Sequence, residues 1–143
     1  MVSAIATKRS KRGGQRVLLV EDDPVLALDL EAALLDAGAR EVVICPTMAA
    51  ALAYLEQSRP DAIILDVHLA DRDDGWALAE LAGMLATRLP RIAFSTGSPE
   101  DIPPAIRELG PVFEKPYDSR HLADVLLNQK KTGLIERLRD ALR

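Results

Sequence analysis

Short apolar runs alternate with longer amphipathic segments five times along the chain. Runs of four or five apolar residues are typical of buried strands, and apolar positions at helical spacing are typical of helices that cover a sheet. The predicted strands span residues 17–20, 41–44, 62–65, 91–95 and 111–114. The predicted helices span residues 24–37, 47–57, 74–88, a short stretch within 99–109, and 118–129. This alternation predicts an α/β fold with a five-stranded, parallel, doubly wound sheet.

Capping residues support the helix boundaries. Asp23 precedes Pro24, and an acidic cap followed by proline is typical of a helix start. Gly38 suits the end of that helix, and Thr47 is a second expected cap. Three prolines restrict the fourth helix, which we expect to be short because proline interrupts the helical hydrogen bonds. Those prolines are Pro99, Pro103 and Pro104.

Length and composition favour one domain with a core of aliphatic side chains. The chain has 143 residues, of which 48% are hydrophobic and 3% aromatic. No apolar run approaches the length of a membrane span, and the N-terminus does not resemble a secretory signal. The single cysteine, Cys45, excludes an intramolecular disulfide, and we expect it to pack at the end of the second strand. These features predict a cytoplasmic protein that does not insert into membranes.

Charge divides the chain into three parts. Residues 1–16 carry a net charge of +5, residues 17–129 carry −12, and residues 130–143 carry +3. The acidic body argues against direct binding of nucleic acid. We expect a basic, disordered arm over residues 1–14, a folded domain over residues 15–130, and an amphipathic tail over residues 131–143.

Polar side chains follow the predicted strands where ligand sites form in doubly wound sheets. Glu21 and Asp22 follow the first strand, Asp66 the third, Thr96 the fourth and Lys115 the fifth. Three carboxylates at one sheet edge repel one another, and a Mg²⁺ ion, which prefers oxygen ligands, would relieve that repulsion. An aspartate beside such an ion can act as a nucleophile towards phosphorus.

Four motifs in this order resemble the receiver domain of two-component response regulators. They are VLLVEDDP, IILD, FSTG and EKP, and each lies at the end of its predicted strand. The resemblance covers about residues 15–130. It implies a flavodoxin-like (βα)5 fold, to which the apolar spacing in residues 134–142 adds a short extra C-terminal helix. It also implies a phosphorylation-dependent signalling switch that is not a metabolic enzyme and catalyses only its own phosphorylation and dephosphorylation.

The resemblance also implies a role for each matching residue. Asp66 would accept the phosphoryl group, Thr96 would be the switch hydroxyl, and Lys115 the ion-pairing lysine before a cis Pro116. For the metal site, it implies that Asp22, Asp66 and the backbone carbonyl of His68 bind Mg²⁺ directly. Glu21 would bind the ion through water, and the imidazole of His68 would be exposed. The donor would be a sensor histidine kinase or a histidine phosphotransfer protein, and output would pass to an unidentified downstream protein.

The sequence departs from the family pattern at several positions. Val112 stands where receivers often have an aromatic residue, and Ala70 where they often have proline. The loop after the acceptor is unusually acidic from Asp71 to Asp74. The compact spacing after the switch threonine is similar to single-domain, CheY-like receivers of the alphaproteobacterial FATG type, with Ser95 in place of the alanine.

Other classes of function remain open at this point. An aspartate-nucleophile phosphatase needs a second acid two residues after the nucleophile, where His68 stands instead. A nucleotide or flavin binder would favour a glycine-rich first loop, and EDDP places acid there. A receiver that serves only as a docking module or a phosphate sink is a further alternative.

We expect a monomer or weak homodimer. The tail has an apolar stripe that we expect to pack on its own domain or on a partner, formed by Leu134, Ile135, Leu138 and Leu142.

Overall fold

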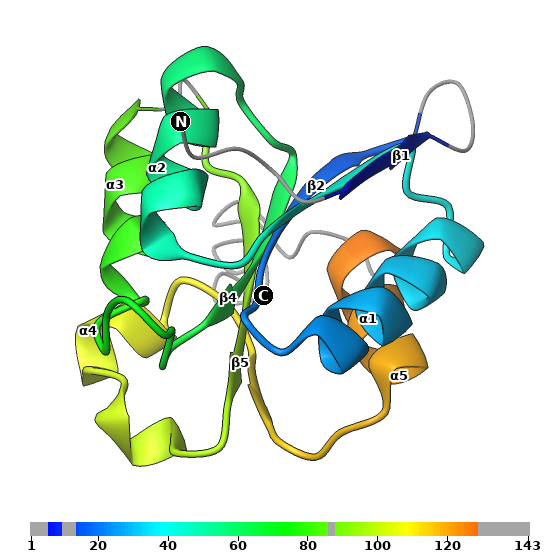
Figure 1. Cartoon of the computed structure of the whole chain (residues 1–143). Helices are drawn as coiled ribbons and strands as arrows, with labels where there is room; N and C mark the ends of the chain where they lie inside the picture. The colour runs from blue at the N-terminus through cyan, green and yellow to red at the C-terminus, as the bar shows by residue number, and fades with distance from the viewer. Residues whose placement is uncertain (1–5, 10–13, 86–87, 129–143) are drawn as a thin grey trace, which may run out of the picture.

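The computed structural model describes residues 6–9, 14–85 and 88–128, and within them one sheet runs through the molecule (Figure 1). Its six strands follow the order β1-β3-β2-β4-β5-β6. They are β1 Ala6–Arg9, β2 Arg16–Val20, β3 Glu41–Cys45, β4 Ala62–Asp66, β5 Arg91–Thr96 and β6 Val112–Glu114. Strands β2 to β6 pair in parallel, which confirms the predicted five-stranded parallel sheet.

The sixth strand, β1, corrects one prediction. Its backbone pairs antiparallel with β3, from Ala6 opposite Ile44 to Arg9 opposite Glu41. Without it, β3 would present a row of unpaired backbone groups at the sheet edge. The prediction of a disordered arm over residues 1–14 is therefore wrong for residues 6–9. The run ATKR has only one apolar residue, so its pairing partner rather than its own pattern determines the strand.

Helices cover both faces of the sheet. They are α1 Pro24–Asp36, α2 Met48–Gln57, α3 Ala77–Leu85, α4 Pro104–Arg107 and α5 Ser119–Leu127, with a 3₁₀ helix η1 Pro99–Asp101 before α4. Helices α1 and α5 lie on one face, and α2, α3 and α4 on the other (Figure 1). The fourth helix is short, as the prolines predicted. The predicted helix in the C-terminal tail falls outside the described residues.

Cap chemistry sets the helix starts as predicted. The Asp23 carboxylate accepts hydrogen bonds from the amides of Val25 and Leu26, at 2.9 and 3.3 Å. The Thr47 hydroxyl accepts one from the Ala50 amide at 3.1 Å. After α1, Gly38 has a φ of 108°, a left-handed conformation that favours glycine.

Helix α3 begins later than predicted, at Ala77 rather than Asp74. The chain first makes a tight turn in which the Gly75 amide donates to the Val67 carbonyl at 3.0 Å. A Cβ atom on Gly75 would lie 2.3 Å from the carbonyl oxygen of Asp66. This close approach requires glycine, and it holds the end of the turn against the end of β4.

The core consists of two aliphatic layers, one on each face of the sheet. Val17 and Leu19 of β2 point to the α1–α5 side, and Leu18 and Val20 point to the α2–α3 side. Cys45 is fully buried at the end of β3, as predicted. In the part of the chain that the structure describes, every helix is too short or too polar to span a bilayer.

Candidate functional site

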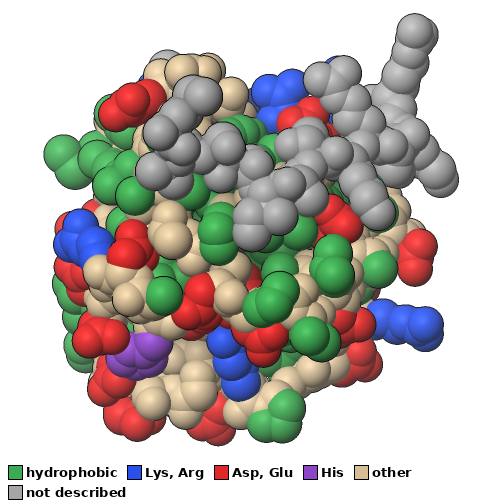
Figure 2. All heavy atoms as spheres, in the orientation of Figure 1, with side chains coloured by type: hydrophobic (Ala, Val, Ile, Leu, Met, Phe, Trp, Pro, Cys, Tyr) green, Lys and Arg blue, Asp and Glu red, His purple; other side chains and the backbone are tan. Residues whose placement is uncertain are grey.

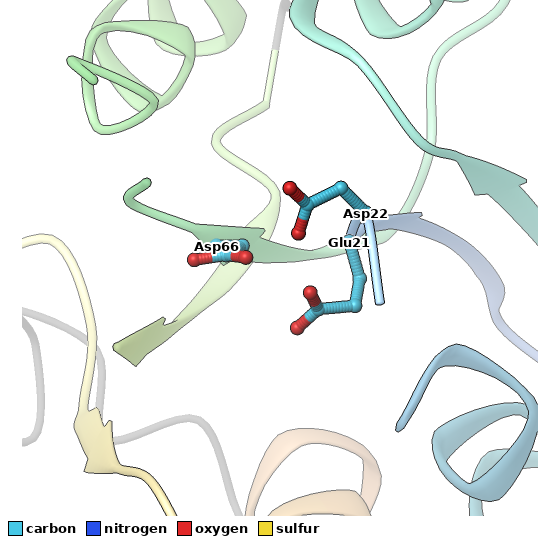
Figure 3. Close-up of side chains that lie close together, drawn as sticks. All are labelled: Glu21, Asp22 and Asp66. Atoms are coloured by element: carbon cyan, nitrogen blue, oxygen red, sulfur yellow. The ribbon is translucent and has the colours of Figure 1, made fainter. Parts of the chain in front are cut away.

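Three carboxylates meet at the carboxyl edge of the sheet. Glu21 and Asp22 follow β2 and Asp66 ends β4, and each offers an oxygen within 4.8 Å of the others (Figure 3). Glu21 and Asp66 are only 2% and 3% exposed, whereas Asp22 is exposed. Figure 2 shows acidic side chains gathered at this end of the molecule. The arrangement is suited to a hard divalent cation that is reached from the Asp22 side.

One lysine joins the two buried carboxylates. Lys115 follows β6, and its Nζ atom lies 3.0 Å from Glu21 Oε1 and 3.3 Å from Asp66 Oδ2. Burial alone would lower the pKa of Lys115, but the bond to Glu21 and the charges of Glu21 and Asp66 outweigh it and raise that pKa. Lys115 is therefore charged in the resting domain and offsets part of the carboxylate charge.

Burial has the opposite consequence for Glu21. Its carboxyl group is removed from water and lies beside Asp66, and the two effects raise its pKa from 4.5 to about 8. The Asp23 amide donates to Glu21 Oε2 at 3.1 Å, and the Lys115 bond also favours the ionised form. The site therefore holds more acid groups than its single ammonium group can neutralise.

Backbone groups orient the predicted acceptor. The His68 amide donates to Asp66 Oδ1 at 3.1 Å, while Lys115 lies at Oδ2. The two oxygens of this carboxylate thus face different partners. The structure brings Asp66 to the centre of the predicted site; the metal-binding role of the His68 carbonyl stays a prediction.

Thr96 is fully buried at the end of β5, next to the strand that carries Asp66. Its Oγ1 atom accepts a hydrogen bond from the Ser98 amide at 3.0 Å, so the hydroxyl hydrogen is left to donate. The Lys115 amide donates to the Thr96 carbonyl at 2.8 Å. This bond fixes the two residues next to each other at the sheet edge.

The imidazole of His68 makes a contact that the sequence reasoning missed. Its Nε2 atom lies 2.8 Å from Asp101 Oδ2 on η1, and its Nδ1 atom lies 3.5 Å from Asp73 Oδ1. The side chain is 40% exposed, so the expected exposure is only partial. The small degree of burial lowers the pKa of His68, but the bonds to Asp101 and Asp73 outweigh it and raise that pKa. Asp101 follows β5 at the same sheet edge, and this was the available signal.

Tyr117 is a second residue that the sequence reasoning missed. Its hydroxyl lies 2.8 Å from Ser95 Oγ, beside Thr96, and burial raises the pKa of the phenol. The bond between Lys115 and Pro116 is cis, as the resemblance implied. Val112 is half buried against the core, and the ring of its neighbour Phe113 packs against the Tyr117 ring at a centroid distance of 5.9 Å.

The acidic loop after the acceptor also has a structural role. The two carboxylate oxygens of Asp71 accept from the amides of Met48 and Ala49, at 3.0 and 3.3 Å. Asp71 therefore caps α2 from outside, in addition to Thr47. The loop is joined to α2 on one side and, through His68, to η1 on the other.

Comparison with known proteins agrees with this geometry. Residues 17–127 match the family model described as the response regulator receiver domain. The chain therefore belongs to the family of response regulator receiver domains, and it has the phosphorylation-dependent signalling role of that family. This membership does not favour the phosphatase and nucleotide-binding alternatives.

Several relatives show the extent of the similarity. The chain is 40% identical over 91 residues to the two-component response regulator ORR21 of Oryza sativa subsp. indica, covering 62% of this chain and 13% of ORR21. It is 33% identical over 85 residues to the phyllosphere-induced regulator PhyR of Methylorubrum extorquens, covering 59% of this chain and 31% of PhyR. The chain thus spans less than a third of the length of either relative.

A solved structure gives a similar match. The receiver domain of sensor histidine kinase PA1611 from Pseudomonas aeruginosa, with a magnesium ion coordinated in its active site cleft, is 29% identical. The match covers 80% of this chain and 95% of that domain, with a TM-score of 0.63. The fold is therefore shared with a receiver domain whose structure holds a magnesium ion.

Proposed function

We propose that Asp66 accepts a phosphoryl group and that the other residues of the site prepare it to do so. The observation that carries the proposal is the position of Lys115 Nζ, 3.0 Å from Glu21 and 3.3 Å from Asp66, at the edge where three carboxylates converge. A buried carboxylate between an ammonium group and an acidic pair can attack phosphorus while the surrounding charges are balanced. Asp22 is exposed at the mouth of the site.

The residues present fit a Mg²⁺ ion. The acidic cluster offers hard oxygen donors within 4.8 Å of one another and carries more negative charge than Lys115 offsets. Asp22 and Asp66 would hold the ion directly, with Glu21 through water and the His68 carbonyl completing the protein ligands. The ion supplies charge neutralisation for the phosphoryl oxygens when bound.

The protein groups have distinct roles in the transfer. An oxygen of Asp66 forms a bond to phosphorus as the bond from phosphorus to the donor nitrogen breaks, and the departing imidazole retains that electron pair. Lys115 moves its contact from the carboxylate to a phosphoryl oxygen. The hydroxyl of Thr96, whose hydrogen is left to donate, bonds to another phosphoryl oxygen.

The donor that fits this site is a phosphohistidine. We propose that a sensor histidine kinase or a histidine phosphotransfer protein supplies it, and that a downstream protein reads the phosphorylated state through direct contact. Hydrolysis of the acyl phosphate, catalysed by the same residues, resets the domain. The cytoplasmic location and the monomeric or weakly dimeric state stay predictions.

A small-molecule phosphodonor tests the assignment without a cognate kinase. Incubation with acetyl phosphate and Mg²⁺ is expected to add one phosphoryl group, which intact-protein mass spectrometry detects. When EDTA removes the Mg²⁺, no addition is expected. Asp66→Asn is expected to abolish this addition. Asp73→Asn, a nearby exposed carboxylate outside the proposed metal cluster, is the matched control and is expected to keep it. Labelling of Asp66→Asn at the wild-type rate would contradict the assignment.

A further inference from the structure

The segment formed by η1 and α4 is joined to the rest of the domain by few polar contacts. Its own backbone is held by Arg107, whose guanidinium donates to the carbonyls of Pro99 and Ile102. Ile102 and Ile106 anchor it in the core beside β5. Among the described residues, the bond between Asp101 and His68 is the one side-chain hydrogen bond that connects η1–α4 to a different element.

That bond ends next to the proposed acceptor. The His68 ring reaches Asp101 at 2.8 Å, and the His68 amide donates to Asp66 Oδ1 at 3.1 Å. One residue thus touches the acceptor carboxylate with its backbone and η1 with its side chain. A second connection runs through Thr96, whose hydroxyl accepts from the Ser98 amide directly before η1. The His68–Asp101 bond therefore joins η1 itself to the proposed phosphorylation site, and the Ser98–Thr96 bond joins the residue directly before η1 to it.

Phosphorylation would place new negative charge beside the acceptor loop, close to an η1 segment that already carries Glu100 and Asp101. The added phosphoryl oxygens would also compete for the His68 amide that now donates to Asp66. Both effects would weaken the bond between His68 and Asp101. The new negative charge repels Asp101, and the competition for the His68 amide shifts the loop that follows Asp66.

We propose that the His68–Asp101 bond is a latch that holds η1–α4 in the resting position and so opposes phosphorylation of Asp66. The effect of the latch on phosphorylation rests on the proposed function, whereas the His68–Asp101 bond itself is present in the unphosphorylated domain. By linkage, a bond that is stronger in the resting arrangement reduces the affinity for any ligand that favours the other arrangement. Asp101 is therefore a positioning residue that acts on the site through His68.

Amide hydrogen exchange of the unphosphorylated protein tests the latch directly. Asp101→Asn is expected to increase exchange of residues 99–109 by about two- to fivefold, the range typical of a partly exposed ion pair. Glu100→Gln removes the same charge from the neighbouring position and is expected to leave that exchange unchanged. Equal exchange in Asp101→Asn, Glu100→Gln and the wild-type protein would overturn the latch.

Binding of beryllofluoride with Mg²⁺ tests its consequence. Asp101→Asn is expected to bind this phosphoryl mimic about two- to fivefold more tightly than the wild-type protein, while Glu100→Gln binds it with unchanged affinity. The variant His68→Asn and the double variant of His68→Asn with Asp101→Asn are expected to show non-additive effects on exchange, because each single change weakens the same bond. An unchanged affinity in Asp101→Asn, or additive effects, would overturn the proposal.

Failure of the wild-type protein to bind beryllofluoride would instead count against the proposed function of Asp66. The amide exchange result would then decide on the latch by itself.

Discussion

Glu21 and Asp66 share the single ammonium group of Lys115, and this sets the electrostatics of the site. Both carboxylates are almost fully buried, and the exposed Asp22 adds a third acid group within 4.8 Å. Burial first, and then the neighbouring Asp66, raise the pKa of Glu21 to about 8. One ammonium group also cannot neutralise three carboxylates. A divalent cation at this edge would therefore stabilise the folded domain.

This imbalance predicts a specific effect of Asp22→Asn. We expect Mg²⁺ to raise the stability of the wild-type protein by about 1.4 kcal/mol at ten times its dissociation constant, because only the folded state assembles the ligands. Asp22→Asn should lose most of this gain, measured by urea unfolding with and without Mg²⁺. Asp23→Asn is the control, since asparagine also caps a helix and Asp23 lies outside the acidic cluster. An equal Mg²⁺ effect in both variants would argue against the proposed ligand.

The positions of the site residues were predictable because each is the last residue of a strand or comes shortly after one. The motif positions of Glu21, Asp66, Thr96 and Lys115 depend only on where parallel strands end. The bonds of His68 to Asp101 and of Ser95 to Tyr117 join residues 33 and 22 positions apart. Such pairs depend on how two loops fold towards each other, and no local pattern encodes that.

The acceptor loop and α2 form one connected unit at the level of secondary structure. Asp71 accepts from two amides at the start of α2, while Thr47 accepts from a third. The exposed groups of Arg72 and Asp74 pair with each other within the loop. The loop that follows Asp66 therefore owes its position partly to a helix of a different βα unit.

We predict that Asp71→Ala lowers the free energy of unfolding by about 1 kcal/mol, the usual cost of losing a helix cap. It should also increase amide exchange at residues 48–49. Asp74→Ala, which removes only a solvent-exposed pair, is the control and should retain wild-type stability. Urea unfolding compares the two variants, and a loss of similar size in both would show that Asp71 does not act as a cap.

Helix starts were predicted where a local cap defines them, as at Asp23 and Thr47. The start of α3 was predicted three residues too early because the turn at Gly75 depends on contact with the end of β4. Strand β1 was missed because its stability comes from pairing with β3. Elements that depend on a distant partner were thus the ones that local patterns failed to predict.

The whole domain shields its single cysteine. Cys45 is fully buried between the sheet and its covering helices, and burial raises the pKa of its thiol from 9.0 to about 12. At pH 9 only about one thiol in a thousand would be ionised in the folded state. Reaction with an alkylating reagent therefore requires the domain to unfold.

We predict that iodoacetamide modifies Cys45 at least about 10³-fold more slowly in the native protein than in urea at pH 8.5. Mg²⁺ should slow the native reaction further, because binding to the folded state reduces the unfolded population. Mass spectrometry over time measures both rates. Rapid native modification that Mg²⁺ does not affect would mean that the thiol is reached by local opening.

The end of α5 lies at the opposite edge of the sheet from the acceptor. Arg91, the first residue of β5, donates to the carbonyl of Leu126, and the Gln15 amide group reaches the carbonyl of Leu127 at 3.5 Å. Asp66 ends β4, so the length of a strand, about 17 Å, separates the two edges. A fluorescent protein or a sensor surface joined to the chain after residue 128 therefore attaches at the face remote from the donor. A domain immobilised in that way leaves the edge that carries Asp66, the proposed phosphorylation site, open to an incoming donor protein.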